Sequence, residues 1–145
     1  MDSPTYLLDV NILLALAEDH AVKHDKVLEW FSTPGLDFGV CAFSGAGFIR
    51  LVMNPKVVPE AWTAYEAIEF LEALAMHPGY HYWPMADNWR TLVVPFLANI
   101  QGHNQIPDAY LLGLALHNNG ILATTDKKIG VIAGQKFRQT LFVVE

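Results

Sequence analysis

The sequence has one cysteine, few basic residues and no long apolar run, and each shortage excludes a class of protein. Cys41 alone cannot form an intramolecular disulfide or a cysteine-rich zinc site. Lysine and arginine number 9 against 15 aspartates and glutamates, and the net charge of −6 excludes a nucleic-acid binder that relies on overall positive charge. No apolar run approaches the roughly 20 residues that a membrane-spanning helix requires.

The first ten residues, MDSPTYLLDV, contain neither a basic segment nor a long apolar segment of the kind that opens a signal peptide. We therefore expect a cytoplasmic protein with no membrane partner. The length of 145 residues and the hydrophobic fraction of 52% are typical of one folded domain, which we place at residues 1–145.

Short apolar runs alternate with helical patterns along the chain. Such alternation is typical of an α/β fold with a mostly parallel central sheet and helices on both faces, a three-layer α/β/α sandwich. The short apolar runs predict strands at 6–10, 38–41, 80–83, 121–123 and 140–144. Apolar residues at helical spacing, together with proline and glycine stops, predict helices at 11–18, 21–32, 43–53, 60–76, 88–99 and 107–117.

Three aspartates occur where a parallel sheet places its functional groups, beyond the carboxyl ends of the strands. Asp9 ends the first predicted strand, Asp126 follows the ILATT segment, and Asp108 opens the helix that begins at Pro107. Each has a purely structural interpretation as well, because aspartate caps helices, binds turn amides and is favoured in a first helical turn. Their convergence at one sheet edge favours a functional interpretation.

Carboxylates that lie close together repel one another unless a cation offsets their charge. Oxygen ligands without histidine or thiolate suit a hard cation, so we predict Mg²⁺ as the cofactor, with Mn²⁺ as the alternative. The predicted metal ligands are Asp9, Asp108 and Asp126.

Five segments carry a resemblance to a known family. The chain resembles the PIN-domain endoribonucleases of the VapC type, the toxins of toxin–antitoxin systems. That resemblance implies a PIN fold, Mg²⁺-dependent cleavage of RNA and a cognate antitoxin that blocks the site. The resembling segments, in the order of the family, are LLDVNILLAL (7–16), DHAVKHDKVLEWF (19–31), CAFSGAGFIRLVMNP (41–55), QIPDAYLLGLAL (105–116) and ILATTDKKI (121–129).

The resemblance also implies which residues are catalytic. Asp9 matches the first acidic position of the family, Asp108 the third and Asp126 the fourth. Asn11 and Thr124 match the polar positions that accompany the first and last acids.

The second acidic position departs from the family pattern. The alignment places Gly45 there, and no aspartate or glutamate occurs between Asp37 and Glu60. Two interpretations stay open: an active ribonuclease with an altered metal site, and a catalytically impaired PIN-like binding module that still recognises an antitoxin.

An acidic protein that cleaves RNA needs local positive charge near its site. Lys127 and Lys128 follow Asp126 directly, with Lys136 and Arg138 shortly after, and we predict that they contact the RNA backbone. Arg50 on the helix over 43–53 is a further candidate for substrate binding. We also expect a homodimer, since aromatic residues on the predicted amphipathic helices suit a dimer or antitoxin contact as well as a core.

Two other enzyme or signalling classes share an aspartate after the first strand. A haloacid-dehalogenase-type phosphatase requires a second aspartate two residues on, where this chain has Asn11. A response-regulator receiver requires paired acids near the first strand, and LLDVN contains one. Both are therefore weaker interpretations than the ribonuclease.

Overall fold

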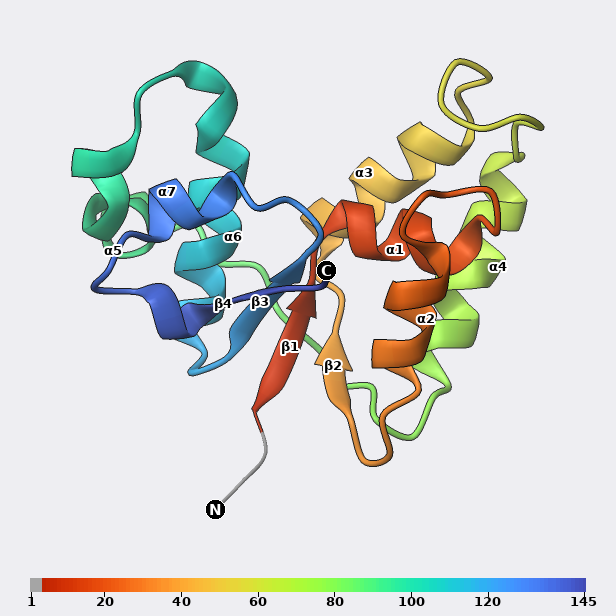
Figure 1. The fold of residues 1–145 in the computed structure, drawn as a ribbon, viewed down its shortest axis with the longest axis horizontal. Coiled ribbons are helices and arrows are strands. Elements are labelled where there is room, and N and C mark those ends of the chain that lie inside the picture. The colour runs from red at the N-terminus through yellow and green to blue at the C-terminus, as the bar shows by residue number, and fades with distance from the viewer. Residues whose placement is uncertain (1–3) are drawn as a thin grey trace.

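Four short parallel strands in the order β2-β1-β3-β4 form the centre of the computed structural model, which describes residues 4–145 (Figure 1). All three neighbouring pairs are parallel, and Leu7 is opposite both Gly39 and Leu122 in register. The predicted α/β class with a parallel sheet is therefore confirmed. The strands are β1 (Thr5–Leu8), β2 (Asp37–Gly39), β3 (Ile121–Thr124) and β4 (Leu141–Val143).

Helices cover the sheet in two groups, which lie on opposite sides of the strands in Figure 1. The first group is α1 (Val10–Ala17), α2 (His24–Phe31), α3 (Ala42–Val52) and α4 (Ala64–Ala75). The second group is α5 (Trp89–Val93), α6 (Ile106–His117) and α7 (Ile129–Ala133), with the 3-10 segments η1 (Val94–Asn99), η2 (His103–Gln105) and η3 (Arg138–Thr140).

Successive residues of the central strands enter two different hydrophobic cores. Leu7 and Leu122 pack with the α5–α6–α7 side, whereas Leu8 and Ala123 pack with the α1–α4 side. Alternate side chains of a strand point to opposite faces of its sheet, so both faces of β1 and β3 are buried. This arrangement explains why these strands are continuous apolar runs.

The predicted strand at 80–83 is wrong. Tyr80 forms a single bridge with Phe38, and the segment that follows has no regular structure. The Trp83 side chain turns into the core instead, where an added Cβ at Gly39 or at Gly120 would collide with its ring. The apolar character of this segment therefore reflects burial of one large ring.

The helices predicted over 60–76 and 88–99 are shorter than expected. The first begins at Ala64, because Thr63 caps it and exchanges side-chain and backbone hydrogen bonds with Glu66. The second is α-helical only to Val93 and then tightens into η1, where Pro95 lacks the N–H that would continue the α-helical pattern. No helix within residues 4–145 has both the length and the apolarity needed to cross a membrane.

Candidate active site

The three predicted aspartates lie at the carboxyl edge of the sheet. Asp9 follows β1 directly, Asp126 lies two residues beyond β3, and Asp108 is in the first turn of α6. The charges of Asp9 and Asp126 both raise the pKa of Asp108, so the three carboxylates are near enough to repel one another. We call Asp9, Asp108 and Asp126 the acidic cluster.

Asp9 is held in place from three directions. Its backbone N–H donates to the Ala123 carbonyl at 3.0 Å, which continues the β1–β3 pairing by one residue. It caps α1, since Oδ1 accepts from the Val10 N–H at 2.7 Å, and Oδ2 accepts from Thr124 Oγ1 at 2.8 Å. The structural role of a cap is therefore real, and it fixes the carboxylate at the sheet edge.

Burial raises the pKa of the Asp9 carboxyl, because only 6% of the residue is exposed and desolvation disfavours the charged form. Its hydrogen bonds from Thr124 and Val10 act in the opposite direction, and the nearby charge of Asp126 raises the pKa further. The hydrogen bonds from Thr124 and Val10 thus favour the ionised form of Asp9, and a cation that offsets the charge of Asp126 would favour it further.

Thr124 and Asn11 connect the first and last strands of the site. Asn11 Nδ2 donates to Thr124 Oγ1 at 3.0 Å, while Asn11 Oδ1 accepts from the Thr125 N–H at 3.0 Å. Thr124 Oγ1 also accepts from the Asp126 N–H at 3.1 Å, so one hydroxyl is shared by Asp9, Asn11 and Asp126. Hydrogen bonds therefore join four of the five residues that the resemblance marked as catalytic, and the fifth, Asp108, is outside this network.

Asp108 differs from Asp9 in having no side-chain hydrogen bond among the described residues. It is half-buried, and burial together with the charges of Asp9 and Asp126 raises its pKa to about 6. A carboxylate that has acidic neighbours and no hydrogen-bond donor is the group that a nearby cation would stabilise most.

The donor set fits a hard cation, although the side chains do not form a complete cage. Among residues 4–145, no three histidine, cysteine, aspartate or glutamate side chains approach closely enough to be a ready-made metal site. Mg²⁺ keeps several of its waters and needs only one or two carboxylates plus substrate phosphate. Asp9 and Asp108 are the two carboxylates that could supply these ligands, and a cation would relieve the repulsion between them.

Of the basic residues predicted to bind RNA, one is already paired. Lys127 Nζ lies 3.3 Å from Glu145 Oε1. Lys128 contributes its backbone N–H to Asp126 Oδ1 at 2.9 Å, and its side chain is exposed. Arg50 is exposed on α3, on a different element from the lysines. The lysines thus lie beside Asp126, whereas Arg50 is in the last turn of α3 and has no contact with the acidic cluster among the described interactions.

Position 45, where the family's second acid was expected, faces another helix. A Cβ added to Gly45 would lie 3.6 Å from Leu71 Cδ1 of α4, in ordinary van der Waals contact. The neighbouring Gly47 is the position of α3 that meets α1, because a Cβ there would collide with Val10. The Cβ of any side chain at position 45 would therefore point toward α4.

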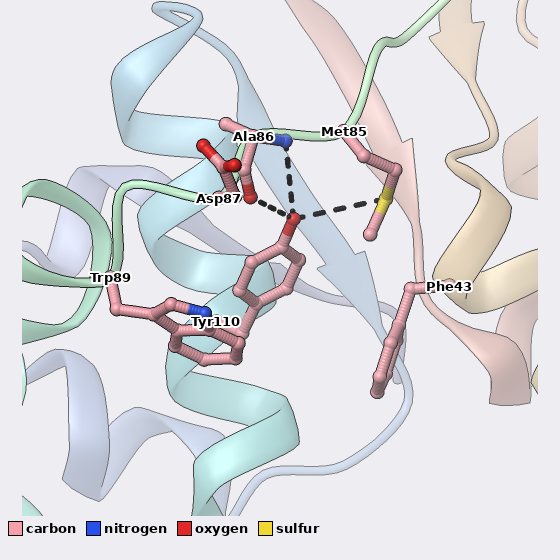
Figure 2. A pocket seen from close by; sticks show the side chains of 6 residues that line it. All are labelled: Phe43, Met85, Ala86, Asp87, Trp89 and Tyr110. Carbon is pink, nitrogen blue, oxygen red and sulfur yellow. Dashed lines mark hydrogen bonds between the residues drawn. The ribbon is translucent and has the colours of Figure 1, made fainter.

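A cavity around Tyr110 was not expected from the sequence. It is lined by aromatic and apolar side chains around Tyr110, two residues after Asp108 (Figure 2). The one available signal was Trp89, a large apolar residue in the polar segment ADNWR. Sequence alone does not distinguish such a residue from a core residue.

Comparison with known proteins identifies the family to which the chain is similar. The profile of the PIN domain matches residues 6–135. Ribonuclease VapC38 of Mycobacterium tuberculosis is 37% identical over 131 residues, covering 90% of this chain and 91% of the relative. Ribonuclease VapC44 of the same species is 34% identical over 130 residues, covering 88% of this chain and 89% of that protein.

A solved structure shows the same fold at much lower sequence identity. VapBC2 from Rickettsia felis, bound to a DNA fragment from its promoter, superposes with a TM-score of 0.64 at 14% identity. The match covers 97% of this chain and 99% of the other. At that identity the likeness extends to the fold alone.

Proposed function

Because this chain belongs to the PIN domain family and is a homologue of the VapC ribonuclease toxins, we propose that it is a Mg²⁺-dependent endoribonuclease whose site is the acidic cluster. The observation that carries the proposal is the placement of Asp9 and Asp126 around the shared Thr124 hydroxyl at the carboxyl edge of the sheet, with Asp108 in the first turn of α6. Hydrolysis would add water across one P–O bond of a single-stranded RNA.

In this proposal Asp9 and Asp108 hold the cation, directly or through water. When bound, Mg²⁺ supplies activation of water and stabilisation of charge on the phosphate. Asp126 completes the cluster and orients the attacking water. Thr124 fixes the rotamer of Asp9 through the 2.8 Å hydrogen bond, and Asn11 ties both to the backbone at Thr125.

The substrate's phosphates must approach a protein with a net charge of −6. Lys128 and Arg50 are exposed and would meet the RNA backbone, and Lys127 would join them on release from Glu145. Because these contacts are electrostatic, RNA binding should weaken as salt rises.

The proposed partner is a cognate antitoxin, as in the VapC systems to which the relatives belong. A segment with arginine would complement the acidic cluster and occupy the place of the cation and substrate. A homodimer stays a prediction of the sequence.

A second candidate is a PIN-like binding module that recognises an antitoxin without cleaving RNA. The missing second acid favours it, because no aspartate or glutamate between Asp37 and Glu60 can supply the charge that the family has on this helix. Catalysis separates the two candidates, since both would bind an antitoxin.

The test is cleavage of a labelled single-stranded RNA by the purified protein with Mg²⁺, Mn²⁺ or a chelator. We expect metal-dependent cleavage that falls at least 100-fold in D9N and in D108N, on the scale seen when a charge-stabilising catalytic group is removed. D25N is the matched control, because Asp25 is an exposed acid on α2. Metal-independent cleavage, or D9N as active as the wild type, would refute the site. No cleavage by the intact wild-type protein would favour the binding module.

A further inference from the structure

A cavity of about 490 Å³ lies between the start of α3, the start of α6 and the segment that leads into α5. Figure 2 shows its lining side chains, with Tyr110 between Phe43 on one side and Trp89 on the other. The lining residues are Phe43, Met85, Ala86, Asp87, Trp89 and Tyr110. We call this space the aromatic cavity.

The rings of the aromatic cavity are fixed but not covered. The Tyr110 hydroxyl donates to the Ala86 carbonyl at 2.7 Å and accepts from the Ala86 N–H at 3.3 Å, which anchors the segment before α5. Phe43 and Trp89 pack against the Tyr110 ring at centroid distances of 5.8 and 5.0 Å. Phe43 is nevertheless 40% exposed and Trp89 53% exposed, so both rings present free surface to a ligand.

The aromatic cavity and the acidic cluster share two elements, although no residue of the cluster lines the cavity. On α6, Tyr110 comes two residues after Asp108, on a different face of the helix. On α3, Phe43 lies four residues beyond the end of β2, and β2 pairs with β1, which Asp9 follows. A single-stranded RNA several nucleotides long can therefore contact the cluster with one nucleotide and the cavity with another.

The charged groups around the cavity suit a nucleotide. Arg90 directly follows the lining residue Trp89 and is exposed. Among residues 4–145 Arg90 forms no ion pair, so it is available to a phosphate. The Asp87 carboxylate in the lining can accept hydrogen bonds from amino groups on the edge of a base.

From this arrangement we propose that the aromatic cavity binds one unpaired base of the RNA substrate, within a few nucleotides of the phosphate that is cleaved. The inference rests on the proposed ribonuclease function. Unpaired bases stack on aromatic side chains and offer their edges for hydrogen bonds, whereas bases inside a duplex do not. The cavity would thus make the enzyme selective for single-stranded RNA.

An apolar side chain of an antitoxin is the competing occupant. It would use the same rings, but it would leave Asp87 without a donor and Arg90 without a phosphate. The combination of exposed aromatic faces, one acidic acceptor and a neighbouring unpaired arginine therefore favours a nucleotide.

The experiment uses a fluorescein-labelled single-stranded octaribonucleotide, bound to the full-length protein with Ca²⁺ in place of Mg²⁺, with its integrity checked on a gel. Matched oligonucleotides lack the base at one position each. For the wild-type protein, removal of one particular base should weaken binding roughly 5- to 100-fold, the range for stacking of one base. W89A should bind the intact oligonucleotide more weakly by a similar factor and should no longer respond to removal of that base.

W89F should retain most of the affinity, because phenylalanine also stacks, and Y65A on the distant helix α4 should bind as the wild type does. The proposal is overturned if W89A binds like the wild type, which would leave the cavity to a protein partner. It is also overturned if no single base removal weakens binding, or if the losses from W89A and base removal multiply.

The same oligonucleotide with Mg²⁺ separates this inference from the proposed function. Cleavage without any dependence on Trp89 would refute the base-binding cavity alone. Base-dependent binding at Trp89 without cleavage would refute the ribonuclease alone.

Discussion

The hydroxyl of Thr124 donates a hydrogen bond of 2.8 Å to Oδ2 of Asp9, although 115 positions separate the two residues in the sequence. The pair joins the ends of β1 and β3, which are neighbours in the sheet. Thr124 is fully buried, so neither its hydroxyl nor the Asp9 oxygen has water as a ready substitute partner. The rotamer of Asp9 therefore depends on a residue of β3.

Replacing Thr124 with valine should reduce cleavage about 10- to 100-fold, the usual cost of losing a residue that orients a metal ligand. Valine keeps the shape but removes the hydroxyl that Asp9, Asn11 and Asp126 share. Because that hydrogen bond lowers the pKa of Asp9, the acidic limb of the pH–activity profile should also move to higher pH in T124V. T124S is the control and should stay near wild type. An unchanged pH profile in T124V would show that the hydrogen bond does not support ionisation of Asp9.

The D108N variant should change how the stability of the metal-free protein depends on pH. Burial and the charges of Asp9 and Asp126 raise the pKa of Asp108 to about 6 in the folded chain, against about 3.9 for an unfolded aspartate. Asp108 therefore binds its proton more tightly in the folded state than in the unfolded state. This proton binding contributes to the free energy of unfolding below pH ~4, and the contribution is lost as the pH rises through about 6. The difference in Tm between D108N and the wild type should therefore become more positive from pH 4 to pH 8.

The same measurement with Mg²⁺ completes this test. Added Mg²⁺ should raise the wild-type Tm more at pH 8 than at pH 5, because the ligand carboxylates must be ionised to bind it. D25N serves as control for the loss of one exposed negative charge. A Tm difference between D108N and the wild type that is constant across pH would contradict the coupling within the acidic cluster.

Those parts of the fold that depend on periodicity along the chain could be predicted from the sequence. The runs around β1 and β3 are apolar throughout because both of their faces are buried, and this pattern is local information. The segment at 80–83 has the same composition for another reason, since Trp83 fills space beside Gly39 and Gly120. No local pattern distinguishes a strand from a single inward-pointing ring.

The acidic cluster was predictable because parallel strands bring their carboxyl ends to one edge, whatever the details of packing. The additional hydrogen bonds of the Thr124 hydroxyl with Asn11 and Asp126 were not, since they depend on the side-chain rotamers and turn geometry of the folded chain. The aromatic cavity was missed for the same reason. Phe43, Trp89 and Tyr110 belong to three different elements, and only their packing brings the rings together.

Gly113→Ala should destabilise the protein by about 1–3 kcal/mol, the usual cost of overpacking a tight contact. Gly113 lies in the middle of α6, where a Cβ would collide with the backbone carbonyl of Leu92 in α5. Backbone cannot move aside as a flexible side chain can, so α6 and Asp108 with it would shift. G130A is the matched control, because nothing lies within 4 Å of a Cβ there. Chemical denaturation measures both variants, and equal stability of G113A and G130A would contradict the close approach of α5 and α6.

Gly45→Glu tests whether the missing second acid can be restored. The family alignment places that acid at position 45, but the structure directs a side chain there toward Leu71 of α4. A glutamate at this buried position would desolvate its charge among apolar groups, at a cost of several kcal/mol, rather than join the acidic cluster. We therefore expect G45E to lower the free energy of unfolding without increasing cleavage or Mg²⁺ affinity. G45A is the control and should fold normally, since its Cβ makes only the 3.6 Å contact with Leu71. If G45E folds stably and cleaves RNA faster than the wild type, position 45 does reach the cluster, and α3 must be oriented differently in the active protein.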